Sequence, residues 1–403
     1  MTEQEKPIIT SLLWTDLYKV TMGQAVFHNY PEVGAVYEYI NRGKHEFPVG
    51  FGEKLQAQVE MMTDLSLTKS DREFLERKSP YLQPDYLDYF ENYRFNPNEV
   101  HIEQSGTELR IDIEGPWQRT IYWEVPLMAL ICEMFYQENG QTPDSQYVNR
   151  ARKKGRQMKE ADAWFFEFGT RRAFSHNVHR NVLEALVETS GTPENGGVLL
   201  GTSNIALAKE FDLNPGGTYA HEWVMGMAAL FGFENANRKA MEIWADEYLG
   251  RTGGEAFPKL GTALMDTYTT EAFLKGLTAE LMAYYTYGRQ DSGVPIEKGE
   301  KAYKRLEELG FDTQKKGVAF TDGLSIEKAL EVNAYFKDKL HVFGIGTELT
   351  NDAGHRPMNM VIKTHAYTKD GIWLPACKLS DDVGKGSGDI AALKEARQIF
   401  SVI

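Results

Sequence analysis

From about residue 160 to residue 350, short apolar runs that end in small or polar residues alternate with helix-like stretches. The apolar runs lie at 164–168, 197–200, 217–220, 262–265, 285–288, 318–320 and 342–343. Between them lie amphipathic stretches, such as the one after Ser175 in which Val178, Val182 and Leu186 repeat at helical spacing. Repeated strand–helix units imply parallel strands, and about seven of them predict a closed or nearly closed α/β barrel. An open doubly wound sheet is the competing architecture.

The first 140 residues mix helix-like and strand-like segments without a regular rhythm. Ser70 predicts the N-cap of a short helix, because an acidic residue follows three positions later. Leu109, Ile111 and Ile113 alternate with charged residues, as expected of a half-buried strand.

The charge and composition of the 403 residues limit the possible partners and compartments. The formal net charge is −14, which argues against nucleic acid as the main partner. An acidic protein that binds polyanions must gather its cations locally and recruit a divalent metal. The start of the chain lacks the features of a signal peptide, and the apolar run at 125–132 is too short to span a bilayer. With only Cys132 and Cys377, a disulfide framework is excluded, and we expect a cytoplasmic protein.

A basic stretch without any acid follows the first apolar run. It contains Arg171, Arg172, His176, His179 and Arg180. Because it lies where a strand turns into a helix, guanidinium groups and backbone amides could face an anion there. A solvated basic helix face is an equally good interpretation. The two histidines could hold a metal only with a third ligand, which the sequence does not supply nearby.

Two further strand ends carry residues suited to phosphate and sugar. Gly346 and Thr347 end a glycine-containing turn whose amides could approach a phosphate, although an ordinary tight turn explains the spacing as well. Arg289 and Asp291 place a fixed cation beside a carboxylate that could accept the hydroxyls of a ribose diol. A structural ion pair is the alternative for these two residues.

His221 is the sharpest single candidate for chemistry. It follows the run at 217–220, at the start of a predicted helix, and Glu222 beside it could orient the imidazole. A lone histidine is more often structural. His221 nevertheless shares the carboxyl-end face of the predicted barrel with the other candidates, and this face is where α/β barrels build active sites.

Seven segments together closely resemble the nicotinate phosphoribosyltransferase family, in the family's order and across nearly the whole chain. They are Thr-Asp-Leu-Tyr-Lys-Val-Thr-Met at 15–22, Glu-Phe-Gly-Thr-Arg-Arg-Ala at 167–173, Gly-Thr-Ser-Asn at 201–204, Gly-Thr-Tyr-Ala-His at 217–221, Arg-Gln-Asp-Ser-Gly at 289–293, Thr-Asp-Gly at 321–323 and Phe-Gly-Ile-Gly-Thr at 343–347. The resemblance implies an irregular α/β barrel of the type II phosphoribosyltransferase kind. This barrel would span 141–354 and be fused to a second α/β domain formed by 1–140 and about 355–403. It also implies a homodimer with shared active sites.

The same resemblance assigns roles around nicotinic acid. Tyr18 would stack on the pyridine ring, reaching in from the neighbouring subunit, and Phe168 would supply the other aromatic face. Thr218 and Arg289 would hold the nicotinate end. Ser203 stands where the related nicotinamide enzymes have an aspartate, which would repel a carboxylate, so this serine favours nicotinic acid.

The remaining roles concern the second substrate, phosphoribosyl pyrophosphate, with ATP and Mg²⁺ as cofactors. Arg171, Gly346 and Thr347 would contact its phosphates, and Asp291 its ribose. His221 matches the histidine that the family phosphorylates with ATP. The resemblance therefore implies ATP-stimulated synthesis of nicotinate mononucleotide for NAD.

One departure and two alternatives accompany this reading. Val294 replaces an Asp or Asn that many relatives carry, which puts a secondary polar contact in doubt. The first alternative is the same reaction on nicotinamide. The second is a catalytically silent metabolite-binding protein on the same scaffold.

Overall fold

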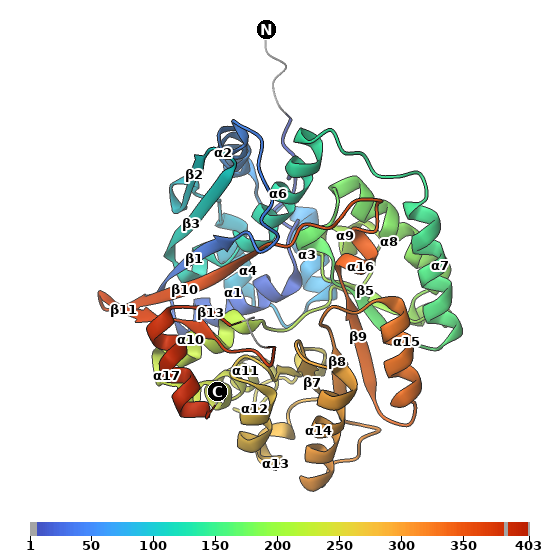
Figure 1. The fold of residues 1–403 in the computed structure, drawn as a ribbon. Helices are drawn as coiled ribbons and strands as arrows, with labels where there is room; N and C mark the ends of the chain where they lie inside the picture. The colour runs from blue at the N-terminus through green and yellow to red at the C-terminus, as the bar shows by residue number, and fades with distance from the viewer. Residues whose placement is uncertain (1–5, 383–385, 402–403) are drawn as a thin grey trace.

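Six parallel strands form one sheet in the order β5-β4-β9-β8-β7-β6 in the computed structural model, which describes residues 6–382 and 386–401 (Figure 1). Their bounds are β4 Phe165–Glu167, β5 Leu199–Thr202, β6 Thr262–Leu264, β7 Tyr287–Gln290, β8 Gly317–Phe320 and β9 His341–Ile345. Six of the seven predicted strands are therefore present. All pairings in this sheet are parallel, so the carboxyl ends of the strands lie at one edge.

Helices connect these strands as the strand–helix pattern predicts. They are α7 Tyr147–Glu160, α8 His176–Ser190, α9 Ile205–Glu210, α10 His221–Phe231, α11 Ala236–Tyr248, α12 Thr270–Gly276, α13 Ala279–Met282, α14 Pro295–Glu308, α15 Ile326–Tyr335 and α16 Thr347–Thr350. In α8 the Ser175 hydroxyl caps the first turn, and Val178, Val182 and Leu186 are buried. The sequence predicted this helix correctly because its apolar positions repeat at the helical period.

The predicted strand at 217–220 is wrong. This segment contains no strand, and it lies between β5 and β6, where the sheet is interrupted. Gly216 N donates to Thr202 O of β5 over 2.9 Å, and Thr218 Oγ1 donates to Thr262 O of β6 over 3.1 Å. Gly217 has a φ of 143°, which takes the backbone out of the strand conformation. The segment therefore bridges the gap of an irregular barrel through irregular hydrogen bonds.

An antiparallel sheet in the order β11-β10-β1-β3-β2 forms the second domain. Its bounds are β1 Gly34–Ile40, β2 Val100–Ser105, β3 Glu108–Pro116, β10 Val361–Lys369 and β11 Ile372–Pro375. Strands β10 and β11 come from the end of the chain; β10 pairs with β1 and β11 pairs with β10, which confirms a second α/β domain built from both ends. Leu109, Ile111 and Ile113 are buried in β3, as predicted.

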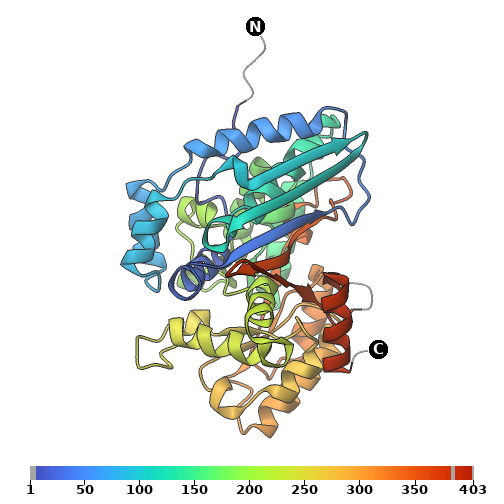
Figure 2. The same ribbon diagram turned by 90° about the vertical axis from the view of Figure 1, so that its left-hand side faces the viewer.

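Helices surround this sheet and connect it to the barrel (Figure 2). They are α1 Leu17–Asn29, α2 Phe51–Met61, α3 Lys69–Lys78, α4 Pro84–Asn92, α5 Trp117–Thr120, α6 Glu124–Glu138 and α17 Ile390–Phe400, with a short β12 Cys377–Lys378 paired to β13 Ser387–Gly388. The predicted cap at Ser70 is wrong, because α3 begins at Lys69 and its N-cap is Thr68, two residues before Ser70. Thr68 and Asp71 form the capping box instead.

The interior is continuous across both domains, since the buried apolar side chains form one cluster. None of the helices described is long and apolar enough to cross a membrane.

Candidate functional site

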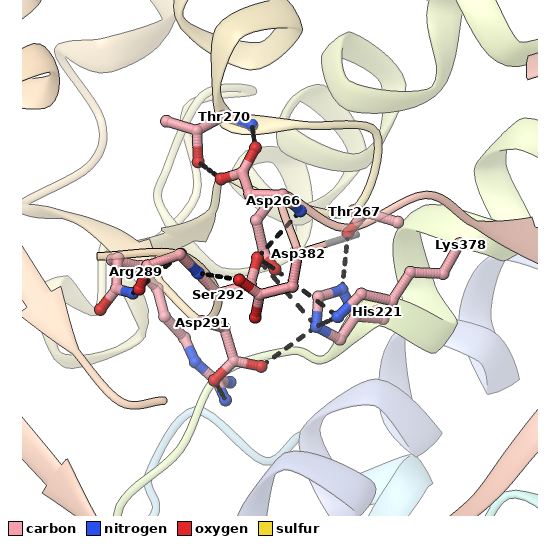
Figure 3. A network of polar contacts seen from close by, with 12 residues as sticks. His221, Asp266, Thr267, Thr270, Arg289, Asp291, Ser292, Lys378 and Asp382 are labelled. Atoms are coloured by element: carbon pink, nitrogen blue, oxygen red, sulfur yellow. Dashed lines mark hydrogen bonds and ion pairs between the residues drawn. The ribbon is translucent and has the colours of Figure 1, made fainter. Parts of the chain in front are cut away.

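His221 is the first residue of α10, and its ring lies in a polar network at the carboxyl ends of β6 and β7 (Figure 3). Nδ1 lies 2.9 Å from Thr267 Oγ1, and Nε2 lies 3.1 Å from Asp291 Oδ2. Lys378 Nζ donates to the same Nε2 over 2.7 Å. The structure therefore brings together the two residues for which chemistry was predicted, His221 and Asp291.

The imidazole of His221 is neutral at neutral pH. Burial, assisted by the ammonium of Lys378, lowers its pKa from 6.5 to about 4, although Asp266 and Asp291 oppose the shift. A neutral imidazole has a lone pair on one nitrogen and can act as a nucleophile.

Asp291 directly follows β7 and is held on both carboxylate oxygens. Arg289 Nη2 donates to its Oδ1 over 2.9 Å, and Thr321 Oγ1 donates to the same atom over 2.6 Å. Burial raises the pKa of this carboxyl, but the guanidinium of Arg289 and, more weakly, the ammonium of Lys378 act in the opposite direction, and the net pKa falls well below its ordinary value. Asp291 is therefore an anion that faces His221.

Asp266 follows β6 and adds a second carboxylate to the network. Ser292 Oγ donates to its Oδ2 over 2.5 Å, and Lys378 Nζ lies 3.5 Å from that oxygen. Its Oδ1 is buried and accepts no hydrogen bond from any residue that the structure describes. His221, Asp266 and Asp291 each offer a ligand atom, all within 4.8 Å of one another, so they could hold a cation.

Arg171 lies beside Tyr18 on a short 3₁₀ turn, Thr170–Arg172, that follows β4. The guanidinium carbon is 5.8 Å from the centroid of the Tyr18 ring, a cation–π distance. Glu124 accepts a hydrogen bond from each of them, from Arg171 Nη1 over 3.2 Å and from the Tyr18 hydroxyl over 3.2 Å. The predicted pyridine-stacking residue and the predicted phosphate ligand are therefore neighbours within one chain.

Phe168 lies with the glycine turn rather than with Tyr18. Its ring stacks on Phe166 with centroids 5.8 Å apart, and within the described part of the chain it makes no ring contact with Tyr18. Gly346 packs so closely here that an added Cβ would lie 2.9 Å from Phe168 O. Thr347 begins α16 directly after this turn.

Three predicted nicotinate ligands form hydrogen bonds with the protein itself. Ser203 Oγ donates to Asp16 Oδ1 over 2.8 Å. Burial raises the pKa of this aspartate, against the opposing charge of Arg171. The Thr218 hydroxyl donates to a carbonyl of β6. Arg289 uses Nε and Nη2 on Thr321 and Asp291, which leaves its Nη1 for a substrate carboxylate.

The expectation that Glu222 orients His221 is wrong. The Glu222 carboxylate points toward a different set of residues and accepts from Lys19, from the Tyr37 hydroxyl over 2.6 Å and from Trp117 Nε1 over 2.8 Å. Successive residues at the start of a helix face different directions, which is why neighbouring positions in sequence do not imply contact.

Much of the predicted basic stretch is structural. Arg180 pairs with Glu210 and Glu184 at the surface. His179 is buried with its Nε2 2.8 Å from Glu167 Oε2, and His176 stacks on a tryptophan ring. Only the arginines at 171 and 172 remain as candidates to bind an anion.

Three half-buried cations extend the site; Arg172 was predicted with the basic stretch, whereas Arg42 and Lys363 were not. Arg42 follows β1, Arg172 follows Arg171, and Lys363 lies on β10. None of them forms an ion pair with any described carboxylate. Burial, Lys378 and Arg42 lower the pKa of Lys363 to about 7, and burial, Arg171 and Arg42 lower that of Arg172 to about 10. These mutual effects place the cations close to one another, as an anion site requires. No spacing in the sequence indicates Arg42 or Lys363.

Comparisons with known proteins match nearly the whole chain. Residues 164–403 match the model of the nicotinate phosphoribosyltransferase (NAPRTase) family, and residues 13–132 match that of its N-terminal domain. The nicotinate phosphoribosyltransferase of Chromohalobacter salexigens is 40% identical over 98% of this chain and 99% of its own. Crystal structures of nicotinate phosphoribosyltransferases superpose with TM-scores of 0.92 for Porphyromonas gingivalis and 0.88 for Vibrio cholerae. The first is 36% identical and covers 98% of this chain and 100% of its own, and the second is 33% identical and covers 98% and 94%.

Proposed function

Because the chain belongs to the nicotinate phosphoribosyltransferase family, we propose that it joins nicotinic acid to the 5-phosphoribosyl group of phosphoribosyl pyrophosphate, with stimulation by ATP. The products are nicotinate mononucleotide and pyrophosphate. ATP acts by phosphorylating His221. The observation that carries this proposal is the neutral His221 imidazole held between Thr267 and the anionic Asp291.

The transfer itself needs alignment and charge neutralisation more than covalent help from the protein. The pyridine nitrogen attacks C1 of the ribose, the new N–C bond forms, and the C1–O bond breaks as pyrophosphate leaves. Arg171, Arg172, Arg42 and Lys363 supply the cations that an acidic protein needs for so anionic a substrate. Asp291 carries the negative charge that stabilises a cation-like ribose.

Mg²⁺ fits the two carboxylates of the network. The unbonded, buried Oδ1 of Asp266 lies near Asp291, and carboxylate oxygens are the ligands that Mg²⁺ prefers. When bound, the ion would neutralise phosphate oxygens of the substrate. The ammonium of Lys378 lies 3.5 Å from Asp266 and balances part of the same negative charge.

Phosphorylation of His221 forms an N–P bond as the bond between the γ-phosphorus and the bridging oxygen of ATP breaks and ADP leaves. With the Nδ1 proton donated to Thr267, the lone pair lies on Nε2, the atom that faces Asp291 and Lys378. Lys378 can then pair with the phosphoryl oxygens. The new charge would shift the site toward the state that binds phosphoribosyl pyrophosphate tightly.

The proposal includes a cytoplasmic homodimer with shared sites. Stacking of nicotinate between Phe168 and a second aromatic ring needs a tyrosine that the same chain does not place beside Phe168. Tyr18 of a second subunit would supply it. Light scattering of the purified protein should then give twice the mass of the 45.7 kDa chain.

The direct test incubates the pure protein with nicotinate, phosphoribosyl pyrophosphate and Mg²⁺, with and without ATP, and measures nicotinate mononucleotide by chromatography. The proposal expects product in both reactions and more with ATP. A His221→Asn variant should keep the ATP-independent product and lose the stimulation. Folded protein that makes no product would revive the silent metabolite-binding alternative.

A further inference from the structure

Glu124, the first residue of α6, is shared by two side chains of the site. Its Oε1 accepts from Arg171 Nη1, and its Oε2 accepts from the Tyr18 hydroxyl, each over 3.2 Å. Bonds from cationic or phenolic donors to a carboxylate are about twice as strong as neutral ones. One carboxylate therefore fixes both the Tyr18 ring and the Arg171 guanidinium, which also stack against each other.

Lys19 keeps Glu124 ionised in the interior. The Lys19 ammonium is fully buried, 2.6 Å from Glu124 Oε2, and it also contacts Glu222. Burial raises the pKa of Glu124, but Lys19 and Arg171 lower it more, and the net effect is a lowered pKa. Glu222 is anchored in turn by Tyr37 and Trp117, so the cluster is tied to the start of α10 beside His221.

The ionised Glu124 carboxylate can only accept hydrogen bonds, and both of its oxygens accept from protein donors. It therefore does not itself bind a polyanion. Its charge acts against anion binding, because it offsets part of the charge of Arg171. A carboxylate beside a residue that binds phosphate is therefore useful only for holding that residue, here Arg171, in place. It occupies one of five guanidinium N–H groups and leaves the others for substrate.

We propose that Glu124 is a positioning residue for both substrates, orienting Tyr18 toward the pyridine ring in the neighbouring subunit's site and Arg171 toward the phosphates. This inference rests on the proposed function, because it takes the roles of Tyr18 and Arg171 from it. The alternative is that Glu124 merely balances charge, and the two roles predict opposite changes in the binding of phosphoribosyl pyrophosphate when Glu124 is replaced. Removing a countercharge would strengthen the binding of phosphoribosyl pyrophosphate, whereas removing a positioning group weakens it.

The test measures kcat and both KM values for Glu124→Gln, Tyr18→Phe and the double variant. Glu247→Gln is the matched control, because Glu247 is equally exposed at 11% but bonds to Gln24 and His28 instead. For Glu124→Gln we expect both KM values to rise about tenfold while kcat changes less than about twofold. Tyr18→Phe should raise the KM for nicotinate alone.

The double variant tests whether Glu124 acts through Tyr18. Its KM for nicotinate should not exceed that of Glu124→Gln, because the two substitutions break the same hydrogen bond between Tyr18 and Glu124. Full multiplication of the two effects, a lower KM for phosphoribosyl pyrophosphate, or unchanged KM values in Glu124→Gln would each overturn the inference. An inactive wild-type protein would instead refute the proposed function.

A second variant covers the case in which Glu124→Gln does not fold because Lys19 loses a buried partner. Lys19→Met combined with Glu124→Gln removes one charge of each sign; Glu222 loses its contact with Lys19 but keeps its hydrogen bonds from Tyr37 and Trp117. The same rise in both KM values is expected of it. Wild-type KM values in this folded double variant would contradict a positioning role.

Discussion

The Nε2 atom of His221 lies 3.1 Å from Oδ2 of Asp291, joining the start of α10 to the end of β7 across 70 residues of sequence. Within the same network Lys378 Nζ reaches Nε2 from the end of the chain. The three groups explain how a histidine among carboxylates stays neutral, because burial and the ammonium outweigh the two acids.

The first prediction concerns the pH dependence of phosphorylation. Because the pKa of His221 is lowered from 6.5 to about 4, the rate of labelling by ATP should be flat from pH 8 to pH 6 and fall only toward pH 4. Between pH 6.5 and about pH 4, His221 is protonated in the unfolded chain but not in the folded protein. Acidification through this range should therefore also lower the free energy of unfolding. Rapid-quench labelling across pH checks the rate. A midpoint near 6.5 would show an ordinary, exposed imidazole.

A second prediction isolates Lys378. Lys378→Met removes a cation that lowers the pKa of His221, so that pKa should rise but remain below 6.5, because burial is the larger cause. NMR titration of the His221 ring measures it directly, and Lys298→Met, which loses a cation bonded to the nearby Asp381, is the control. No change in the His221 titration would exclude a contact in solution.

Substrate choice gives a third prediction. Ser203→Asp places a second carboxylate beside Asp16, whose Oδ1 is 2.8 Å from the serine hydroxyl. We expect kcat/KM for nicotinate to fall more than about tenfold and the fall for nicotinamide to be smaller, since only nicotinate is an anion. Ser203→Ala, without the charge, should keep the preference. Competition of both substrates in one reaction gives the ratio, and an unchanged ratio in Ser203→Asp would refute the argument.

Lys363 supplies the fourth prediction. Its pKa of about 7 means that its charge is lost as the pH rises from about 6 to about 8, so the KM for phosphoribosyl pyrophosphate should increase over that range. Lys363→Met should show a KM raised about tenfold at pH 7 and little further change with pH. Lys369→Met, on the same strand but facing Glu32, should behave like the wild type. A wild-type pH slope in Lys363→Met would remove this residue from the anion site.

The barrel could be predicted from the sequence because short apolar runs and amphipathic repeats are local signals. Six strands and the Val178–Val182–Leu186 face of α8 followed from them. The conformation of the segment at 217–220 could not be predicted. Its composition resembles that of a strand, but the positive φ of Gly217 takes the backbone out of the strand conformation. The cap of α3 moved to Thr68, since two neighbouring hydroxyl residues compete for one position. The domain limits themselves stay predictions.

From the residues themselves, the site was predicted only where a polar residue follows a strand-like run. Asp291 and His221 follow strand-like runs and were found together. Lys378 is 157 residues from His221, and Lys363 lies on a strand of the other domain, so only tertiary structure brings them there. Glu222 was assigned to His221 from adjacency, and the helix geometry turned it toward Lys19. The roles of the predicted nicotinate and phosphate ligands remain predictions.

The most direct test of the account is to incubate the protein with ATP labelled at the γ-phosphate, quench in alkali, and map the label by peptide sequencing. The account predicts acid-labile label on His221 in the wild type, none in His221→Asn, and discharge of the label during turnover with nicotinate and phosphoribosyl pyrophosphate. A folded, catalytically active wild-type protein that takes up no label at His221 would contradict it.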